Sequence, residues 1–282
     1  MTGGLRRVRV GSEELVVLAA PSGLHALGAA LADLLGAGLE ALHRAVDEAL
    51  ARPPLAGEIE TLPPVDRQEV WASGVTYERS RQARVDESVV AQAYNLIYDA
   101  ERPEIFFKAP AYRVPPPGAP LRIRADSSWD VPEPELALVL TARTEIAGYL
   151  VADDLSSRSI EGENPLYLAQ AKIWDDSIGL SDTIALARDL GDRARSAAIE
   201  LRIERGGETV FQGETSTAQM RRSFEELASY LFRELSHPHG AVLMTGTGLV
   251  PPDEFTLEHG DTVEIEIEGV GTLRHAVHRS GR

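Results

Sequence analysis

Two glutamates at the start of an apolar segment have the spacing of a cation site. Glu133 and Glu135 stand two residues apart, directly before the apolar run 136–140. Because side chains along a strand repeat with a period of two, both carboxylates would leave the same face. Two like charges side by side repel each other, so a positive group must lie between them or one must hold a proton.

A second apolar run, residues 148–152, ends in Asp153 and Asp154. If it returns as a strand beside the first, one of these aspartates reaches the glutamate pair. Three hard oxygen ligands favour a hard divalent cation. Mg²⁺ fits best, with Mn²⁺ or Ca²⁺ as alternatives, because the segment has no histidine or cysteine that would favour zinc. The competing interpretation is a solvated strand face and a turn, since acidic pairs are common.

Lys172 and Glu104 are the candidates for proton transfer. Lys172 follows the apolar run 166–171, which places an ammonium group near the acidic residues, although an exposed lysine on a strand is the alternative. Glu104 precedes the apolar residues 105–107. A carboxyl group at the edge of a buried strand suits proton transfer, but the residues alone are also compatible with a simple strand end.

The composition restricts the class of protein. The 282 residues, 43% hydrophobic and 26% charged, are typical of a globular chain with a substantial core. The 28 Lys+Arg against 44 Asp+Glu give a net charge of −16, which argues against nucleic-acid binding. There are no cysteines, which excludes disulfides and thiolate chemistry. The N-terminus lacks a signal-peptide core and no run approaches the roughly 20 apolar residues of a membrane span, so we expect a cytoplasmic protein.

The surrounding pattern predicts two domains. Residues 5–19 predict a hairpin, and residues 25–52 predict two helices divided near Gly36 and Gly38. Prolines follow, and we expect a small α/β N-terminal domain over residues 1–68 and a catalytic domain over 69–282. In the second domain we expect a helix over 221–235 capped by Ser216 or Thr217. Strands are expected at 121–123, 199–204, 208–212, 241–244, 262–268 and 271–277.

Motifs of the second domain resemble the fumarylacetoacetate hydrolase (FAH) family. They are PEPELALVL, VADDLSSRS, AQAKIW, TGTGLVPPDEFTLEHGD and GVGTLRH, and the resemblance runs from about Trp71 to the C-terminus. It implies an α+β fold, with a β-rich mixed-sheet roll as the catalytic domain, assembled as a homodimer or higher homo-oligomer. It also implies the metal ligands Glu133, Glu135 and Asp154, the aspartate being the one that aligns before the family's S-x-R motif.

Two further stretches, YDAERPEIFFKAP and SSRSIEGENPLYLAQAK, resemble the branch of the family that dehydrates 2-keto-3-deoxy sugar acids, such as 2-keto-3-deoxy-arabinonate. The resemblance implies a Mg²⁺-dependent hydro-lyase that forms a dioxo acid such as 2,5-dioxopentanoate through an enolate. Lys172 would be the base and Glu104 the acid for the C4 hydroxyl, or the reverse. A departure from many relatives is Ser159, where they have a second aspartate.

A second departure concerns the water-activating residue of the hydrolases. They have a tyrosine followed three residues later by a histidine, and here Tyr77 is followed by Ser80. Neither Ser80 nor its neighbours Arg79 and Arg81 is a good general base, which counts against C–C bond hydrolysis. We expect Arg79, Ser80 and Arg81 to bind the substrate, with the guanidinium groups on its carboxylate or hydroxyls, although a solvated helix face is the alternative.

The loop Thr245, Gly246 and Thr247 follows an apolar strand, and its small residues let N–H groups approach a carboxylate. The family uses this loop beside its metal, so we assign it to substrate binding. His275 and His278 are expected to be ordinary loop residues, because no third zinc ligand lies at motif spacing.

Two other functions stay open. One is a hydrolase or decarboxylase acting on acylpyruvates or oxaloacetate with the same metal and lysine. The other is a non-catalytic scaffold, which the intact acidic cluster and lysine count against.

Overall fold

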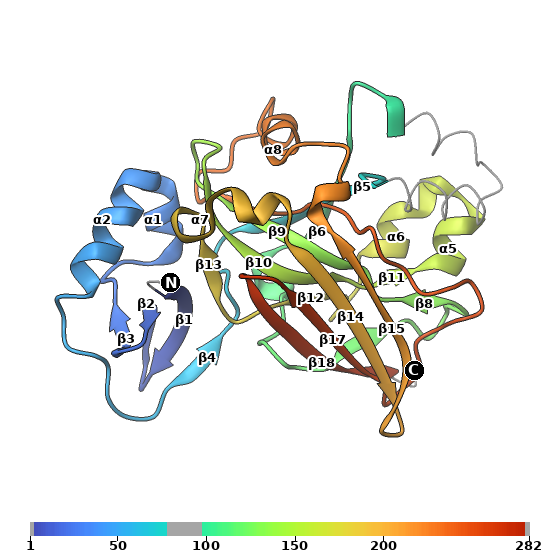
Figure 1. The fold of residues 1–282 in the computed structure, drawn as a ribbon, viewed down its shortest axis with the longest axis horizontal. Helices are drawn as coiled ribbons and strands as arrows, with labels where there is room; N and C mark the ends of the chain where they lie inside the picture. Colours follow the sequence, from blue (N-terminus) through green and yellow to red (C-terminus); the bar gives the residue numbers. More distant parts are fainter. Residues whose placement is uncertain (1–2, 78–97, 280–282) are drawn as a thin grey trace.

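The computed structural model describes residues 3–77 and 98–279, and strands form its framework (Figure 1). Eleven of the described strands make one sheet, in the order β3-β2-β1-β13-β10-β9-β16-β5-β6, with β12 beside β10 and β4 beside β1. Among the described pairs of this sheet only β16 with β5 is parallel. The strands are β1 (Gly4–Val10), β2 (Glu13–Ala20), β3 (Gly23–Ala26), β4 (Glu60–Leu62), β5 (Glu69–Gly74), β6 (Glu104–Ala109), β9 (Pro134–Leu140), β10 (Ile146–Asp154), β12 (Ile178–Leu180), β13 (Ile184–Leu186) and β16 (Ala241–Met244).

A second sheet of five described strands has the order β15-β14-β17-β18-β7. Its strands are β14 (Ala198–Arg205), β15 (Glu208–Ser216), β17 (Thr262–Ile267), β18 (Gly271–Arg279) and β7 (Leu121–Ile123). Alternate apolar residues of β14 and β17 are buried against the inner residues of β9 and β10 in one core, as the period of a half-buried strand requires. A short pair, β8 (Asp130–Val131) with β11 (Ser156–Ser157), lies beside the end of β10.

The central strands β9 and β10 are covered on both faces. Leu136 and Leu138 belong to the core shared with the second sheet, whereas Ala137 and Val139 belong to a second core. That second core includes residues of the helices α1 (Leu31–Ala37) and α2 (Leu39–Ala49). Burial on both faces explains why the run 136–140 is apolar throughout rather than alternating.

The other described helices are short: α5 (Arg158–Glu163), α6 (Leu168–Lys172), α7 (Ala187–Leu190) and α8 (Phe224–Leu231), with 3₁₀ turns at Ala111–Arg113, Pro165–Tyr167, Gly191–Arg195 and Thr217–Gln219. The prediction that Ser216 or Thr217 caps the long helix is wrong. Ser223 caps α8 by accepting from the Glu226 N–H at 3.1 Å, and Ser216 caps the preceding 3₁₀ turn. No described helix is long and apolar enough to span a membrane.

The predicted N-terminal hairpin and helix pair are present, with Gly38 between the helices in a left-handed conformation at φ 93°. The structure adds β3, which carries a buried His25. β1 pairs with β13 of the following region, so the N-terminal strands continue the large sheet. The predicted α+β class with mixed sheets is confirmed, and the boundary after residue 68 stays a prediction.

Candidate active site

The three predicted acidic residues converge at one end of the β9–β10 pair. Ala152 lies opposite Glu135, and the Asp154 N–H donates to the Glu133 carbonyl at 3.0 Å. Residues opposite each other on paired strands point to the same face, so the three carboxylates share a side. Each offers an oxygen, and the three oxygens lie within 4.8 Å of one another. The side chains are 1–3% exposed, so the alternative of a solvated face and turn is wrong.

The same alternation sends Asp153 to the opposite face. There its Oδ2 lies 2.8 Å from Nε2 of His275 in β18, while its Oδ1 accepts from the Glu133 N–H at 3.0 Å. His275 is therefore a buried residue of the strand predicted over 271–277, and it supports the acidic cluster. The separate interpretation of His275 as an ordinary loop residue was wrong. Sequence spacing did not indicate this contact because 122 residues separate the two partners.

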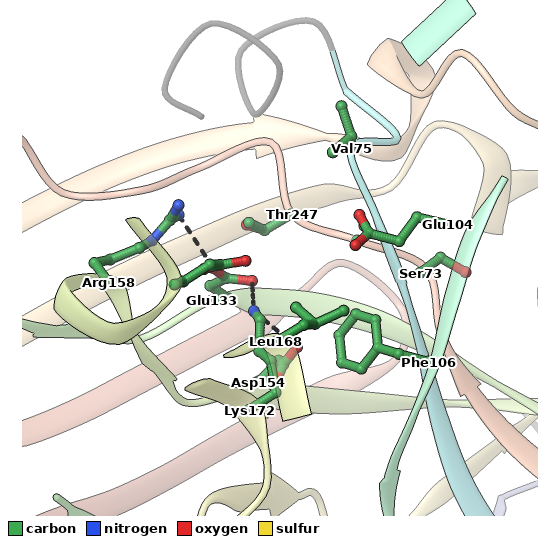
Figure 2. Close-up of a pocket in the computed structure, with 13 residues that line it drawn as sticks. Ser73, Val75, Glu104, Phe106, Glu133, Asp154, Arg158, Leu168, Lys172 and Thr247 are labelled. Atoms are coloured by element: carbon green, nitrogen blue, oxygen red, sulfur yellow. Dashed lines mark hydrogen bonds and ion pairs between the residues drawn. The ribbon is translucent and has the colours of Figure 1, made fainter. Parts of the chain in front are cut away.

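Lys172 ends α6 and points into the acidic cluster (Figure 2). Its Nζ donates to Glu133 Oε2 at 2.8 Å, to Asp154 Oδ2 at 3.2 Å and to Ser156 Oγ at 2.5 Å. Arg158, at the start of α5, approaches the other Glu133 oxygen at 3.1 Å. The alternative of an exposed strand lysine is wrong, because Lys172 is helical and buried.

Lys108, which the sequence did not single out, is a second buried ammonium group at this site. Its Nζ lies 2.5 Å from Asp154 Oδ1 and forms an ion pair with that carboxylate. It donates to the carbonyls of Leu155 at 3.0 Å and Lys172 at 2.5 Å. Burial lowers the pKa of Lys108, and the Asp154 carboxylate acts in the opposite direction.

The donor set fits a divalent cation. Burial, together with the Asp154 and Glu133 carboxylates, raises the pKa of Glu135 well above its ordinary value, even though the Gly246 N–H donates to its Oε2 at 2.6 Å. The nearby Lys172 charge also lowers the pKa of Glu135, but it offsets the rise only in part. Three carboxylate oxygens without nitrogen or sulfur suit Mg²⁺, Mn²⁺ or Ca²⁺.

A pocket opens above the cluster, and Glu104 lines it together with Lys172. Glu104 begins β6 as predicted, and the strand period places Phe106 on the same face. The carboxylate of Glu104 lies over Gly74 of β5, where an added Cβ would overlap it and come within 2.7 Å of Cδ. Gly74 is thus the residue that lets the glutamate extend over the neighbouring strand.

The three loop residues predicted to bind substrate, Thr245, Gly246 and Thr247, make different contacts. Gly246 and Thr247 line the pocket, whereas Thr245 does not. The Thr245 hydroxyl donates to the Leu136 carbonyl at 2.8 Å and so holds the loop to β9. Gly246 has a φ of 90°, a conformation that favours glycine. The binding roles of these three residues stay predictions.

Two further pocket residues were missed by sequence reasoning. Val75 has a φ of 52°, which is strained for a β-branched residue and is found where surrounding structure enforces it. Ser73 lines the pocket, and its buried hydroxyl has no hydrogen-bond partner among the described residues. The predicted substrate-binding residues Arg79, Ser80 and Arg81 lie outside the described residues.

A hollow of about 540 Å³ elsewhere is less suited to chemistry. Its arginines Arg122 and Arg124 already pair with Asp175 and Asp126 at 3.4 and 2.6 Å. The acidic pocket remains the candidate active site.

A mixed-sheet roll whose pocket joins a buried carboxylate triad, a buried lysine and a second glutamate defines a metal-dependent enzyme for a small anionic substrate. The family model described as fumarylacetoacetate (FAA) hydrolase C-terminal matches residues 69–278. The chain belongs to the fumarylacetoacetate hydrolase family, and the predicted membership is confirmed.

The chain is similar to named relatives and to solved structures. The chain is 50% identical over 214 residues to the probable 2-keto-3-deoxyxylonate dehydratase of Haloferax volcanii, covering 76% of this chain and 73% of that protein. It is 41% identical over 220 residues to the 2-dehydro-3-deoxy-D-arabinonate dehydratase of Saccharolobus solfataricus, covering 77% and 74%. A solved structure of 2-keto-3-deoxy-D-arabinonate dehydratase complexed with magnesium and 2,5-dioxopentanoate has a TM-score of 0.83 at 33% identity, over 99% of each chain.

Proposed function

We propose that this protein is a hydro-lyase that removes water from a 2-keto-3-deoxy sugar acid, with a pentonate such as 2-dehydro-3-deoxy-D-arabinonate as substrate and 2,5-dioxopentanoate as product. The observation that carries the proposal is the placement of Glu104 and Lys172, from different elements, in one pocket beside the Glu133 and Asp154 carboxylates. The names of the two relatives at 41% and 50% identity support the substrate class.

Glu133, Glu135 and Asp154 are the residues we propose as ligands of Mg²⁺. When bound there, the cation would supply Lewis acidity to the 2-keto group of a substrate and so make the protons on C3 more acidic. The magnesium in the solved structure of the arabinonate dehydratase supports this choice of ion. Arg158 adds a fixed positive charge to the pocket wall, which favours an anionic substrate on a chain of net charge −16.

Lys172 is the residue we assign to removal of the C3 proton. Its Nζ lies within hydrogen-bond distance of two of the three carboxylates, so it lies close to the carbon next to a keto group held at the cluster. Glu104 then gives a proton to the C4 hydroxyl, which leaves as water while the C3–C4 double bond forms. The unsaturated product then isomerises: C5 and its hydroxyl oxygen each lose one proton, C3 and C4 each gain one, and C5 becomes the aldehyde. The reverse assignment of the two residues is the alternative.

The burial of the acidic cluster counts against a non-catalytic scaffold. Charges removed from water cost free energy unless they are paired, and replacing a buried ion pair with apolar residues is often neutral or stabilising. A chain that served only as a scaffold would have no need of this buried triad, in which Glu133 and Asp154 are paired with two buried lysines.

The test is a turnover assay of the purified protein with 2-keto-3-deoxy pentonates and hexonates, acylpyruvates and oxaloacetate, before and after chelation. We expect dehydration of a sugar acid that is lost with chelator and restored by Mg²⁺. Lys172→Ala and Glu104→Gln should each lower kcat by about 10²-fold or more, the usual contribution of a general acid or base. Glu40→Gln, on the exposed face of α2, is the matched control and should leave kcat unchanged.

Proton exchange separates the two roles. In D₂O, Glu104→Gln should still exchange the C3 protons of the substrate, as seen by NMR, while Lys172→Ala should not. The opposite pattern would reverse the assignment. Turnover of acylpyruvates or oxaloacetate alone would favour the hydrolase or decarboxylase, and near-native activity of both variants would contradict the proposed site.

The remaining expectations about the assembled protein also stay proposals. We propose a homodimer or higher homo-oligomer that acts in the cytoplasm, with a small N-terminal domain over residues 1–68 and a catalytic domain over 69–282. The family resemblance supports the oligomeric assembly, and the start of the family match at residue 69 supports the domain boundary. Light scattering would test assembly against the chain mass of 30.6 kDa.

A further inference from the structure

Lysine is used at two places only in this chain. Lys108 and Lys172 are the lysines among its 28 basic residues, and the others are arginines. Both lysines are buried beside the acidic cluster. Arginine presents a planar fork of donors, whereas lysine offers a compact charge with three donors that point in different directions. The presence of lysine at these two positions, and of arginine at the other basic ones, therefore indicates that both sites need a compact ammonium group. The proposed reaction uses only Lys172.

The three directions of the Lys108 ammonium group lead to three different parts of the site. One leads to Asp154 Oδ1 at 2.5 Å, a second to the Leu155 carbonyl at 3.0 Å, and the third to the Lys172 carbonyl at 2.5 Å. Lys108 thus contacts the Asp154 carboxylate of the triad, the backbone carbonyl of the next residue, and the backbone carbonyl of the other lysine.

Each contact fixes the geometry of a group that faces the pocket. With Oδ1 of Asp154 held by Lys108, Oδ2 is directed to the interior of the cluster, where Lys172 Nζ donates to it at 3.2 Å. The carbonyl of Lys172 lies at the end of α6, where carbonyls lack partners within the helix. Lys108 supplies that partner, together with the Ser177 hydroxyl at 3.2 Å.

Lys108 itself is separated from the pocket. It is 0% exposed and is not among the residues that line the pocket, whereas Phe106 of the same strand face is. On another side its Nζ lies 5.3 Å from the centre of the Trp174 ring. A group so enclosed acts through its neighbours, and a purely stabilising role explains it poorly because burying an ion pair gains little.

We propose that Lys108 is a positioning residue, whose ammonium group holds the Asp154 carboxylate and the Lys172 backbone at a fixed separation so that the triad can accept a divalent cation with the Lys172 amine beside it. The proposal rests on the proposed function for the roles of Asp154 and Lys172. Groups that orient metal ligands in this way contribute about 10- to 100-fold to metal affinity.

A role of Lys108 through its charge and a role in positioning Asp154 predict opposite changes in cation affinity when Lys108 is replaced. The proposal can therefore be tested by measuring that affinity. If Lys108 acted only through its positive charge, removing it would strengthen cation binding, because one repulsive neighbour is lost. If it positions Asp154, removing it weakens binding. Lys108→Met keeps the length of the side chain without charge or donors, and Lys108→Arg keeps the charge in a shape that cannot donate in the same three directions.

The experiment measures Mn²⁺ binding to the metal-free protein by electron paramagnetic resonance, with circular dichroism and thermal unfolding as checks of folding. We expect Lys108→Met and Lys108→Arg to bind Mn²⁺ at least 10-fold more weakly than the unmodified protein. Arg188→Met removes an ion pair of 2.9 Å with Asp47 away from the site and should bind Mn²⁺ normally. Lys108→Gln, which retains amide donors, should show the same loss, and it serves if Lys108→Met fails to fold.

Unchanged or tighter Mn²⁺ binding by a folded Lys108 variant would overturn the positioning role, as would failure of the unmodified protein to bind Mn²⁺. Should the unmodified protein bind Mn²⁺ yet dehydrate none of the sugar acids, the proposed substrate is wrong. Mn²⁺ binding to the variants would still decide the role of Lys108 in that case.

Discussion

Asp130 is a buried carboxyl group outside the acidic triad, and its environment makes stability depend on pH. Burial raises its pKa from 3.8 to about 6, and Arg279 of β18, at 3.3 Å from Oδ2, offsets this only in part. Ser127 and Arg124 act in the same direction as Arg279. Because the folded-state pKa is above the unfolded value, the contribution to stability is complete below about pH 3.8 and is lost as pH rises through about 6.

Asp130→Asn should therefore remove a pH-dependent loss of stability. For the shift from 3.8 to about 6, the unmodified protein should lose about 1.4 kcal/mol of its free energy of unfolding between pH 5 and pH 8 through this group. Urea unfolding of both proteins at the two pH values measures the difference. A difference between the two proteins that stays constant with pH would show that Asp130 ionises as it does in the unfolded chain.

The residues of the site differ in how far sequence could predict them. The strand period and one assumed return predicted the glutamate pair with one of the two aspartates, because these residues are neighbours in a single hairpin, and the family resemblance selected Asp154. Lys108 left a signal in the composition, the scarcity of lysine, but its contacts depend on how β6 lies against β10 and α6. No sequence signal indicated the role of His275, because His275 lies in β18 of the second sheet and its partner Asp153 lies in β10 of the large sheet.

Gly74 and Glu104 show that the approach of two strands controls the site. Gly74 of β5 lies opposite Glu104 of β6, and the space over the glycine is occupied by the glutamate side chain. Gly74→Ala should displace the Glu104 carboxylate and lower kcat by roughly 10²-fold, the effect of about 1 Å of misplacement of a catalytic group. Steady-state kinetics and the free energy of unfolding should be measured together.

Gly207→Ala is the matched control for this prediction. Gly207 lies between β14 and β15 at φ 88° with open space around its Cα, so alanine there should cost about 1 kcal/mol of stability through backbone strain and leave kcat unchanged. Equal effects of the two substitutions on kcat would show that the loss is a general consequence of replacing glycine, and not of moving Glu104.

The bounds of an element could be predicted where one local sequence signal was present. They were predicted wrongly where two signals competed. β7 and β16 have the predicted bounds because turn residues and apolar runs agree there. Two capping residues precede α8. Ser216 caps the 3₁₀ turn Thr217–Gln219, and Ser223 caps α8 itself. The sequence pattern contained both signals, but the loop between them depends on packing against other elements.

At the scale of the molecule, the N-terminal region shares its core with the catalytic sheet. Leu18 of β2 and Leu42 of α2 belong to the same buried cluster as Val139 and Leu150 of the central strands. β1 also closes the edge of β13. The sequence predicted the region's elements from local periodicity, but not this continuity, because the pairing of β1 with β13 joins segments about 180 residues apart that no local pattern connects.

The continuity of sheet and core predicts that the two proposed domains unfold together. Calorimetry of the full chain should show one cooperative transition, because loss of the N-terminal region would uncover the shared core and the edge of β13. A shortened chain beginning at residue 69 should lack a cooperative transition and should aggregate, since it exposes both a buried apolar surface and an unpaired strand edge. Leu42→Ala, within the N-terminal region, should lower the melting temperature of the whole chain through a cavity costing about 2–5 kcal/mol. Two separate transitions in the full chain, with Leu42→Ala shifting only one of them, would instead establish residues 1–68 as an independent folding unit.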